Sequence, residues 1–158
     1  MTAGPAIEIG WHTTGRDELR PLFELAEEPE VLESYLSDGR VLVAREADMA
    51  VGHLQLVDPG QPATLEVKNM AVAESHRGRG VGRALMERAI AEARTEGART
   101  LLVATAAADT GNLRFYQRLG FRLLRVQRDA FTAAQGYRDD IVIDGIPLRD
   151  QVWLSHEL

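Results

Sequence analysis

The chain has 158 residues, 45% of them hydrophobic and 27% charged, which fits a globular domain with a sizeable core and argues against a disordered, collagen-like or disulfide-rich protein. Eighteen Lys and Arg against 24 Asp and Glu give a net charge of −6, so we expect no general affinity for nucleic acid or for an anionic membrane. Without cysteine, the chain has neither a thiol nucleophile nor a thiolate metal site.

The N-terminal segment over residues 1–13 has neither the basic region nor the apolar run of a signal peptide. No stretch approaches the roughly 18 apolar residues of a membrane-spanning helix. We therefore expect a cytoplasmic protein with a single domain over residues 1–158.

One strand and two short helices are predicted at the start of the chain. Apolar residues that alternate with polar residues or glycine predict a strand over residues 6–13. Apolar residues at helical spacing then predict a helix that Asp17 or Thr14 caps. These apolar residues are Leu19, Leu22, Phe23 and Ala26. A second helix is predicted over residues 29–37.

The next segment predicts three strands. The apolar runs 41–44 and 51–57 are joined by residues 46–48, which predicts an antiparallel hairpin. Residues 58–62 contain two prolines and a glycine and end this pairing. Residues 64–72 predict the fourth strand.

The longest helical pattern covers residues 80–96 and ends at Gly97. Residues 101–106 are apolar and bounded by turn residues, which predicts a buried strand. A strand, a helix and a strand of these lengths form a parallel pair, so we expect a mixed α/β fold.

The last third of the chain predicts one helix followed by strands. The helix covers residues 111–119 and ends at a glycine, and strand character resumes over residues 121–128. Asp144-Gly145 lies between two apolar triplets, which is a strong signal for a β-hairpin. Residues 151–158 predict the terminal strand.

A segment rich in glycine and arginine joins the fourth predicted strand to the long helix. It contains Arg77, Gly78, Arg79, Gly80, Gly82 and Arg83. Glycines let backbone amides approach a ligand, and the helix N-terminus adds about half a positive charge, so the segment suits a pyrophosphate. A plain glycine-rich turn is the alternative, but the adjoining strand, helix and arginines favour the phosphate site.

The missing motifs narrow the choice of phosphate ligand. A Walker loop needs Gly-Lys-Ser/Thr, and a dinucleotide fingerprint needs GxGxxG after the first strand of a βαβ unit; neither is present. The segment instead resembles the acyl-CoA loop of the GNAT superfamily of N-acyltransferases, whose pattern Gln/Arg-x-x-Gly-x-Gly/Ala is met by Arg77, Gly80 and Gly82. Met70-Ala71-Val72 resembles the end of the family's pantetheine-binding strand.

A second element of the same family lies downstream. Residues 112–121 resemble the helix that places a tyrosine beside the CoA sulfur, with Tyr116 four residues before Gly120. The family often has an asparagine seven residues before the tyrosine; this position is Asp109 here, and the nearest asparagine is Asn112. The resemblance implies a GNAT-like α/β (α+β) fold, with a mixed, twisted sheet of about seven strands, flanking helices and a C-terminal hairpin.

The resemblance also implies an N-acetyltransferase that uses acetyl-CoA as co-substrate and acetylates an amine of a small molecule or peptide. The residues implied to bind acetyl-CoA are Met70, Ala71, Val72, Arg77, Gly78, Arg79, Gly80, Val81, Gly82, Arg83 and Asn112. The backbone N–H of Val72 is implied to bond the thioester oxygen, where the fourth and fifth strands separate. Tyr116 is implied to be the general acid, since a phenol with a pKa of about 10 is protonated at neutral pH.

Glu66 matches a position where some family members carry a carboxylate general base that acts through water. The alternative is an outward-facing polar residue of an alternating strand, with Leu65, Val67 and Asn69 on the other face. Tyr116 has a similar alternative as a core residue on the apolar stripe of its helix.

Three further expectations concern metals, mechanism and rival functions. The four histidines show no metal-ligand spacing, so we assign no metal. Without a thiol to carry the acetyl group, we expect direct transfer in a ternary complex. The rivals are a noncatalytic acyl-CoA-binding or sensing module on the same fold and a nucleotide-binding protein that uses the loop for another phosphate.

The acceptor and the oligomeric state are less constrained. Five glutamates over residues 24–33 could attract a cationic amine, although a solvated helix face is the simpler interpretation. Polyamine, aminoglycoside, amino acid and protein N-terminus all remain open. Trp153 lies opposite Val152 and Leu154, so it is covered by the 144–145 hairpin, lines the acceptor pocket or packs on a second subunit. We expect a homodimer, because terminal strands and exposed hairpins can pair between chains.

Overall fold

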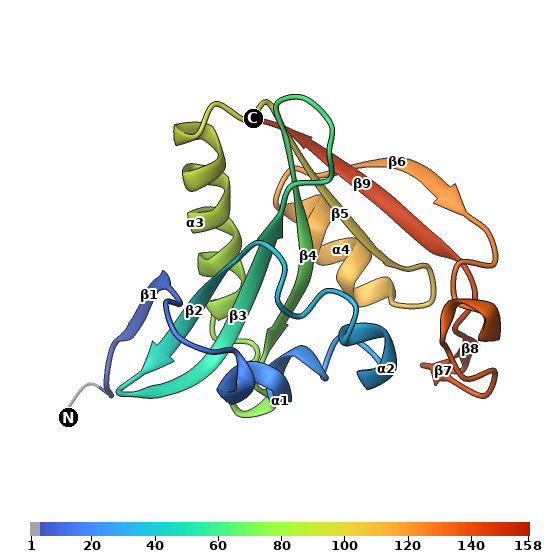
Figure 1. Cartoon of the computed structure of the whole chain (residues 1–158), viewed down its shortest axis with the longest axis horizontal. Coiled ribbons are helices and arrows are strands. Elements are labelled where there is room, and N and C mark those ends of the chain that lie inside the picture. Colours follow the sequence, from blue (N-terminus) through green and yellow to red (C-terminus); the bar gives the residue numbers. More distant parts are fainter. Residues whose placement is uncertain (1–3) are drawn as a thin grey trace.

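The computed structural model describes residues 4–158 and consists of a seven-stranded mixed sheet, a separate two-stranded hairpin and helices on both faces of the sheet (Figure 1). The strands are β1 (Ile7–Trp11), β2 (Arg40–Glu46), β3 (Met49–Val57), β4 (Thr64–Val72), β5 (Thr100–Ala106), β6 (Arg122–Gln127), β7 (Val142–Ile143), β8 (Ile146–Pro147) and β9 (Gln151–Glu157). The helices are α1 (Arg20–Phe23), α2 (Pro29–Leu32), α3 (Val81–Thr95) and α4 (Thr110–Arg118), with 3-10 turns η1 (Asp17–Leu19), η2 (Glu74–His76) and η3 (Ala133–Gln135). No helix within residues 4–158 is long and apolar enough to cross a membrane.

The seven strands of the sheet run in the order β1-β2-β3-β4-β5-β9-β6, which confirms the predicted mixed α/β fold. β4 and β5 are parallel and are connected through α3, as the strand-helix-strand spacing predicted. They pair only where Thr64–Val67 lies beside Thr100–Val103. Their second halves diverge (Figure 1), so these halves make no backbone hydrogen bonds with each other.

Apolar cores lie on both faces of the sheet. On one face, Leu85 and Met86 of α3 are fully buried in the larger core, to which α4 also contributes. On the other face, Phe23 of α1 and Leu32 beside it in α2 pack with Val43 of β2. The side chains of β4 that do not face α3 therefore point into the region covered by the α1–α2 segment.

A β-bulge in β4 decides which of its side chains face α3. Neighbouring residues of β3 pair with Val67 and Asn69, so Lys68 is an extra residue on β4. An extra residue shifts the alternation of faces by one place. Val67 therefore lies in the α3 core, whereas Glu66 and Asn69 share the opposite face. The alternative that grouped Asn69 with Val67 was wrong because strict period-2 alternation contains no bulge.

The first predicted helix is divided in the structure. η1 and the single turn of α1 replace one continuous helix, and α2 is shorter than the predicted range of residues 29–37. Pro21 and Pro29 lie in the first turns of α1 and α2, where each lacks the N–H that would continue a preceding helix. Neither Asp17 nor Thr14 provides a cap, because the N-cap position of η1 is Arg16 and no side chain caps it.

The C-terminal third confirms the predicted hairpin and places the terminal strand inside the sheet. Asp144 and Gly145 both have positive φ angles, as a type I′ turn requires, and they join β7 to β8. β9 pairs with β5 on one side and with β6 on the other. The expectation that the terminal strand is free to pair with a second chain was therefore wrong. The sheet has two edge strands, β1 and β6, and β6 exposes Leu123, Leu124 and Val126.

Candidate active site

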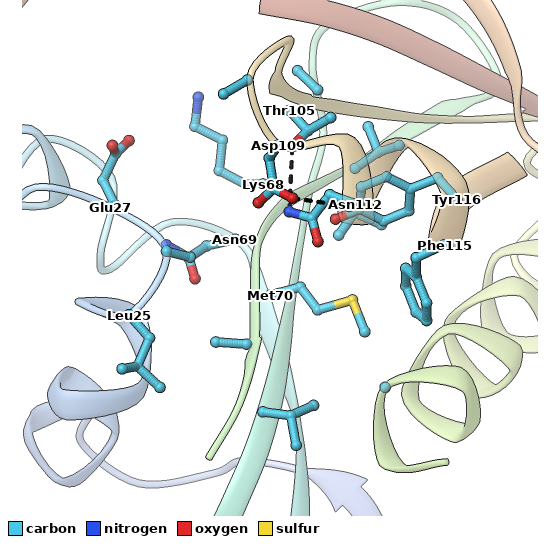
Figure 2. A pocket seen from close by; sticks show the side chains of 18 of the residues that line it. Leu25, Glu27, Lys68, Asn69, Met70, Thr105, Asp109, Asn112, Phe115 and Tyr116 are labelled. Carbon is cyan, nitrogen blue, oxygen red and sulfur yellow. Dashed lines mark hydrogen bonds between the residues drawn. The ribbon is translucent and has the colours of Figure 1, made fainter. Parts of the chain in front are cut away.

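A cavity of about 1110 Å³ lies where β4 and β5 diverge. One end, here called the glycine-loop end, is lined from residues 70–83 and 105–116. The other, the glutamate end, is lined from residues 24–35, 66–69 and 131–153. Figure 2 shows Glu27 and Tyr116 on opposite sides of this space.

The register of β3 and β4 sets the direction of the Val72 amide. Ala73 N–H donates to the Val51 carbonyl at 2.8 Å, so Val72 itself occupies a non-hydrogen-bonded pair with β3. Its N–H therefore points toward β5, which no longer pairs with β4 at this position. Met70, two residues earlier, has the same orientation, whereas Ala71 between them faces β3. The end of β4 thus presents unpaired amides to the cavity.

The N-terminus of α3 is open and has no side-chain cap. Its N-cap residue, Gly80, has a φ of 80°, a left-handed conformation that favours glycine, and Gly78 has a φ of 73°. A Cβ atom added to either glycine would meet no atom within 4 Å. The first turn of α3 lines the cavity, and the free amides of an uncapped helix N-terminus suit a pyrophosphate.

The three arginines of the loop are held in different ways. Arg77 lines the cavity, and its Nε donates to the carbonyl at the end of β4 at 3.1 Å. Arg83 also lines the cavity and bonds Glu87 at 2.8 Å. Arg79 does not line it and lies 3.4 Å from Glu46 instead. The other residues implied to bind acetyl-CoA all line the cavity.

Asp109 and Asn112 play different parts at the start of α4. Asp109 is the N-cap, and its Oδ1 accepts from the Asn112 N–H at 2.9 Å. The Asn112 side-chain amide donates to Thr105 Oγ1 at 3.3 Å (Figure 2). Both residues line the cavity. Because the cap occupies Asp109 and a carboxylate repels phosphate, Asn112 is the better candidate for a contact with acetyl-CoA.

Tyr116 belongs both to the core and to the cavity. Its side chain is only 6% exposed and packs edge-on against Phe115 and Phe121. Its hydroxyl has no hydrogen-bond partner in the described part of the chain, and the residue lines the cavity. Burial, with a smaller contribution from the charge of Asp109, raises the pKa of Tyr116 above its ordinary value. The hydroxyl therefore stays protonated at neutral pH and can donate.

Glu66 is 7% exposed and lines the cavity, so the alternative of an outward-facing residue was wrong. Burial raises the pKa of Glu66, and the charge of Lys68 partly offsets this increase. Within residues 4–158, its carboxylate forms no ion pair and no hydrogen bond with a neighbouring side chain. A buried carboxylate with a raised pKa is suited to accept a proton near neutral pH.

The glutamate end contains a cluster that the sequence did not predict. The hydroxyls of Tyr35 and Tyr137 donate to the two carboxylate oxygens of Glu27, at 3.1 and 2.9 Å. Asn69 donates to the Tyr35 hydroxyl at 3.1 Å, and the His53 ring bonds Asn69 Oδ1 at 2.7 Å. Tyr137 follows Glu27 by 110 positions and lies in no periodic segment, so no local signal marked it.

Aromatic and apolar side chains complete the glutamate end. Trp153 lines the cavity, which is one of the three placements left open for it. The Arg125 guanidinium lies 4.9 Å from the centre of its ring. Phe131 also lines the cavity and packs edge-on against Tyr137 at 5.0 Å between ring centres.

The five glutamates over residues 24–33 divide into two groups. Glu24, Glu27 and Glu28 line the cavity. Glu30 and Glu33 do not; both are exposed, and Glu33 bonds Arg20 at 2.6 Å. The solvated-face interpretation therefore describes the second group, whereas the acceptor-groove interpretation stays a prediction for the first group.

Comparisons with known proteins agree with this geometry. A family model described as acetyltransferase (GNAT) family matches residues 10–121. YvbK, an uncharacterised N-acetyltransferase of Bacillus subtilis, is 35% identical over 153 residues, which cover 96% of each chain. A GNAT family acetyltransferase from Elizabethkingia anophelis with acetyl-CoA bound superposes with a TM-score of 0.87 at 31% identity, covering 96% of this chain and 98% of that one.

A second solved structure, an acetyltransferase of Bacillus subtilis in complex with CoA, also has a TM-score of 0.87, at 32% identity and with 97% and 99% of the two chains covered. Residues 10–121, which the family model matches, include the diverging strands β4 and β5, the glycine loop and α4. The chain therefore belongs to the GNAT family and is an acyl-CoA-dependent N-acetyltransferase.

Proposed function

We propose that residues 1–158 form one domain that transfers the acetyl group of acetyl-CoA directly to an amine of a small molecule or peptide. The observation that carries this proposal is that the Val72 amide, Tyr116 and Glu66 approach one and the same cavity. A cavity with two separately lined ends can hold both substrates at once, as a ternary complex requires. The chain also has no thiol that could carry the acetyl group between two steps.

Acetyl-CoA supplies the acetyl group as a thioester. The amides at the start of α3, with Arg77 and Arg83, bind its pyrophosphate in this proposal. The unpaired backbone of residues 70–72 binds the pantetheine arm, and Asn112 adds a side-chain contact. Arg79 has the weakest support in the set because it pairs with Glu46.

Three groups divide the chemistry. The Val72 N–H donates to the thioester oxygen and stabilises the charge that develops there. Glu66 takes a proton from the acceptor ammonium, through water, so that the neutral nitrogen can form the new C–N bond. The C–S bond breaks, and the Tyr116 hydroxyl gives its proton to the departing thiolate. The second proton that the nitrogen loses as the amide forms restores the Tyr116 hydroxyl, and Glu66 releases the first proton to solvent.

We also propose a homodimer, but its support now comes from β6 rather than from the terminal strand. One edge strand, β6, exposes three apolar side chains, and an exposed apolar edge is a template for pairing with a second chain. Light scattering at tens of micromolar tests this point, and a monomeric mass contradicts it. The cytoplasmic location stays a prediction of the sequence.

Thermal unfolding in the presence of acetyl-CoA, ATP or NAD tests the ligand. Acetyl-CoA at 100 times its dissociation constant is expected to stabilise the protein by about 2.7 kcal/mol. A larger effect of ATP or NAD contradicts the proposal in favour of a nucleotide-binding protein. Release of CoA thiol in the presence of an amine panel then tests catalysis. Stabilisation by acetyl-CoA without release on any amine favours the noncatalytic module.

A further inference from the structure

Within residues 4–158, Asp109 lines the cavity without a cationic partner, but it caps α4 at the glycine-loop end. Two carboxylates at the glutamate end, Glu27 and Glu66, also have no cationic partner. Among the residues that the structure describes, neither lies within ion-pair distance of an Arg, Lys or His side chain, whereas Glu24 and Glu28 each lie 3.8 Å from an arginine. Lys68 also lines the cavity, but its ammonium lies 4.9 Å from the centre of the Tyr35 ring. Lys68 offsets the charge of Glu66 only in part, so two carboxylates without an ion pair leave this end of the cavity attractive to cations.

Hydrogen bonds hold the Glu27 side chain in place without cancelling its charge. Both of its oxygens accept from tyrosine hydroxyls, Tyr35 on one and Tyr137 on the other. These donors are neutral. The Glu28 N–H also donates to Oε2 at 3.3 Å, whereas Oε1 accepts from Tyr35 alone and keeps a second lone pair. Glu27 is therefore an oriented anion that can accept a further hydrogen bond from a cation in the cavity.

The cation that Glu27 binds cannot be the nitrogen that reacts. An amine must lose its proton before it attacks a thioester, and in the proposed mechanism Glu66, not Glu27, takes that proton. Figure 2 also shows Glu27 across the cavity from Tyr116 and Asn112, beside which the thioester is proposed to lie. An acceptor that uses both carboxylates therefore needs two separate amino groups.

The surfaces at the glutamate end favour a hydrocarbon chain between these two groups. Tyr35, Phe131 and Trp153 line it with aromatic rings, and Ile141 and Leu148 add aliphatic surface. Methylene groups pack on such surfaces, and an ammonium is attracted to aromatic faces. A carboxylate on the acceptor would meet the negative charges already present, so an amino acid fits poorly.

We propose that the acceptor is an aliphatic diamine or polyamine, with one ammonium bound by Glu27 and the other amine presented to Glu66 and the thioester. This inference rests on the proposed acetyl transfer and adds the chemical class of the acceptor. No part of the Glu27 cluster is required for binding acetyl-CoA, so the two proposals can fail separately.

The test compares three acceptors of equal chain length by their rates of CoA release: 1,5-diaminopentane, pentylamine and 5-aminopentanoate. For the wild-type enzyme, kcat/KM is expected to be about 10-fold or more higher for the diamine than for pentylamine, the usual contribution of a hydrogen bond to a charged group. It is expected to be lowest for 5-aminopentanoate. Equal values for diamine and pentylamine overturn the proposal.

The variant Glu27→Gln tests whether Glu27 causes the preference for the diamine over pentylamine. The ratio of kcat/KM for diamine over pentylamine is expected to fall close to one in this variant. Glu30→Gln is the matched control, since Glu30 is exposed on α2 and outside the cavity lining, and its ratio is expected to match the wild type. An unchanged ratio in Glu27→Gln overturns the assignment.

The wild-type comparison remains decisive if Glu27→Gln unfolds through loss of its tyrosine bonds, which thermal unfolding detects. Acetyl-CoA binding without transfer to any amine contradicts the proposed function itself. Transfer that prefers pentylamine or 5-aminopentanoate contradicts only the acceptor class.

Discussion

The glycine-loop end of the cavity comes from one stretch of chain, residues 70–116, whereas the glutamate end combines residues 24–35, 66–69 and 131–153. At the first end, most of the proposed contacts are backbone amides that diverging strands and an uncapped helix leave free. At the second end, the contacts are side chains, and the bond between Glu27 and Tyr137 joins positions 110 residues apart.

This difference separates the end of the cavity that tolerates side-chain substitutions from the end that single substitutions can alter. A backbone site depends on local conformation, so many side-chain substitutions leave it intact. A side-chain cluster can be altered at one position without moving the strands beneath it. We therefore expect substitutions at the glycine-loop end to affect every acceptor alike and those at the glutamate end to affect acceptors selectively.

The largest effect is expected from Tyr116→Phe, which keeps the buried ring and removes the proton donor. Turnover is expected to fall by about 10²- to 10⁴-fold for every acceptor, the usual contribution of a positioned acid. Acetyl-CoA affinity, measured by calorimetry, should stay close to wild type. Wild-type turnover would show that Tyr116 is a core residue only.

Gly80→Glu tests the backbone character of the glycine-loop end. A carboxylate beside the pyrophosphate at the start of α3 is expected to weaken acetyl-CoA binding by about 100-fold or more. Gly60→Glu is the control for backbone strain, because Gly60 also has a positive φ, 87°, and open space around it but lies outside the cavity. Equal affinities in the two variants would contradict the loop assignment.

Glu66→Gln tests whether Glu66 is the general base for the acceptor amine. At pH 7, kcat/KM is expected to fall by about 100-fold and to recover as the pH rises, because the amine then loses its proton without help. Burial raises the pKa of Glu66, so the wild-type acid limb should lie above the ordinary pKa of a glutamate, about 4.3. If the pH profile of Glu66→Gln still shows the same decrease in activity at low pH, a group other than Glu66 causes that decrease.

The smallest effect concerns the stability of the glutamate end, which His53 supports through Asn69. Burial lowers the pKa of His53 to about 4, below the value of about 6.5 expected in the unfolded chain. Between these two values the unfolded chain binds the additional proton, so stability falls as the pH drops from 6.5 toward 4. His53 is expected to contribute up to about 3 kcal/mol to this loss.

Urea unfolding at pH 7 and pH 4.5 measures this loss in the wild type and in His53→Gln, which can keep the bond to Asn69. The variant should lose less stability on acidification. The same decrease in both proteins would place the pH dependence elsewhere.

The elements with strong local patterns were predicted well. β4 has the predicted bounds, and α3 begins and ends within one residue of the predicted range of residues 80–96. The alternation of side chains along a strand could not reveal the bulge at Lys68, because the position of the bulge depends on how β3 pairs with β4. Nor could the loop motif show that Arg79 turns to Glu46, which β2 brings alongside.

By itself the sequence determined the succession of strands and helices along the chain. It also identified the glycine loop and Tyr116, and through a family resemblance it predicted the divergence of β4 and β5. These features depend on the spacing of residues within one segment or between two nearby segments. Only the tertiary structure decided that Glu27, Tyr35, Asn69 and Tyr137 form one cluster. Such a cluster depends on where distant segments return to the sheet, and burial and chain topology decide this without leaving a periodic pattern in the sequence.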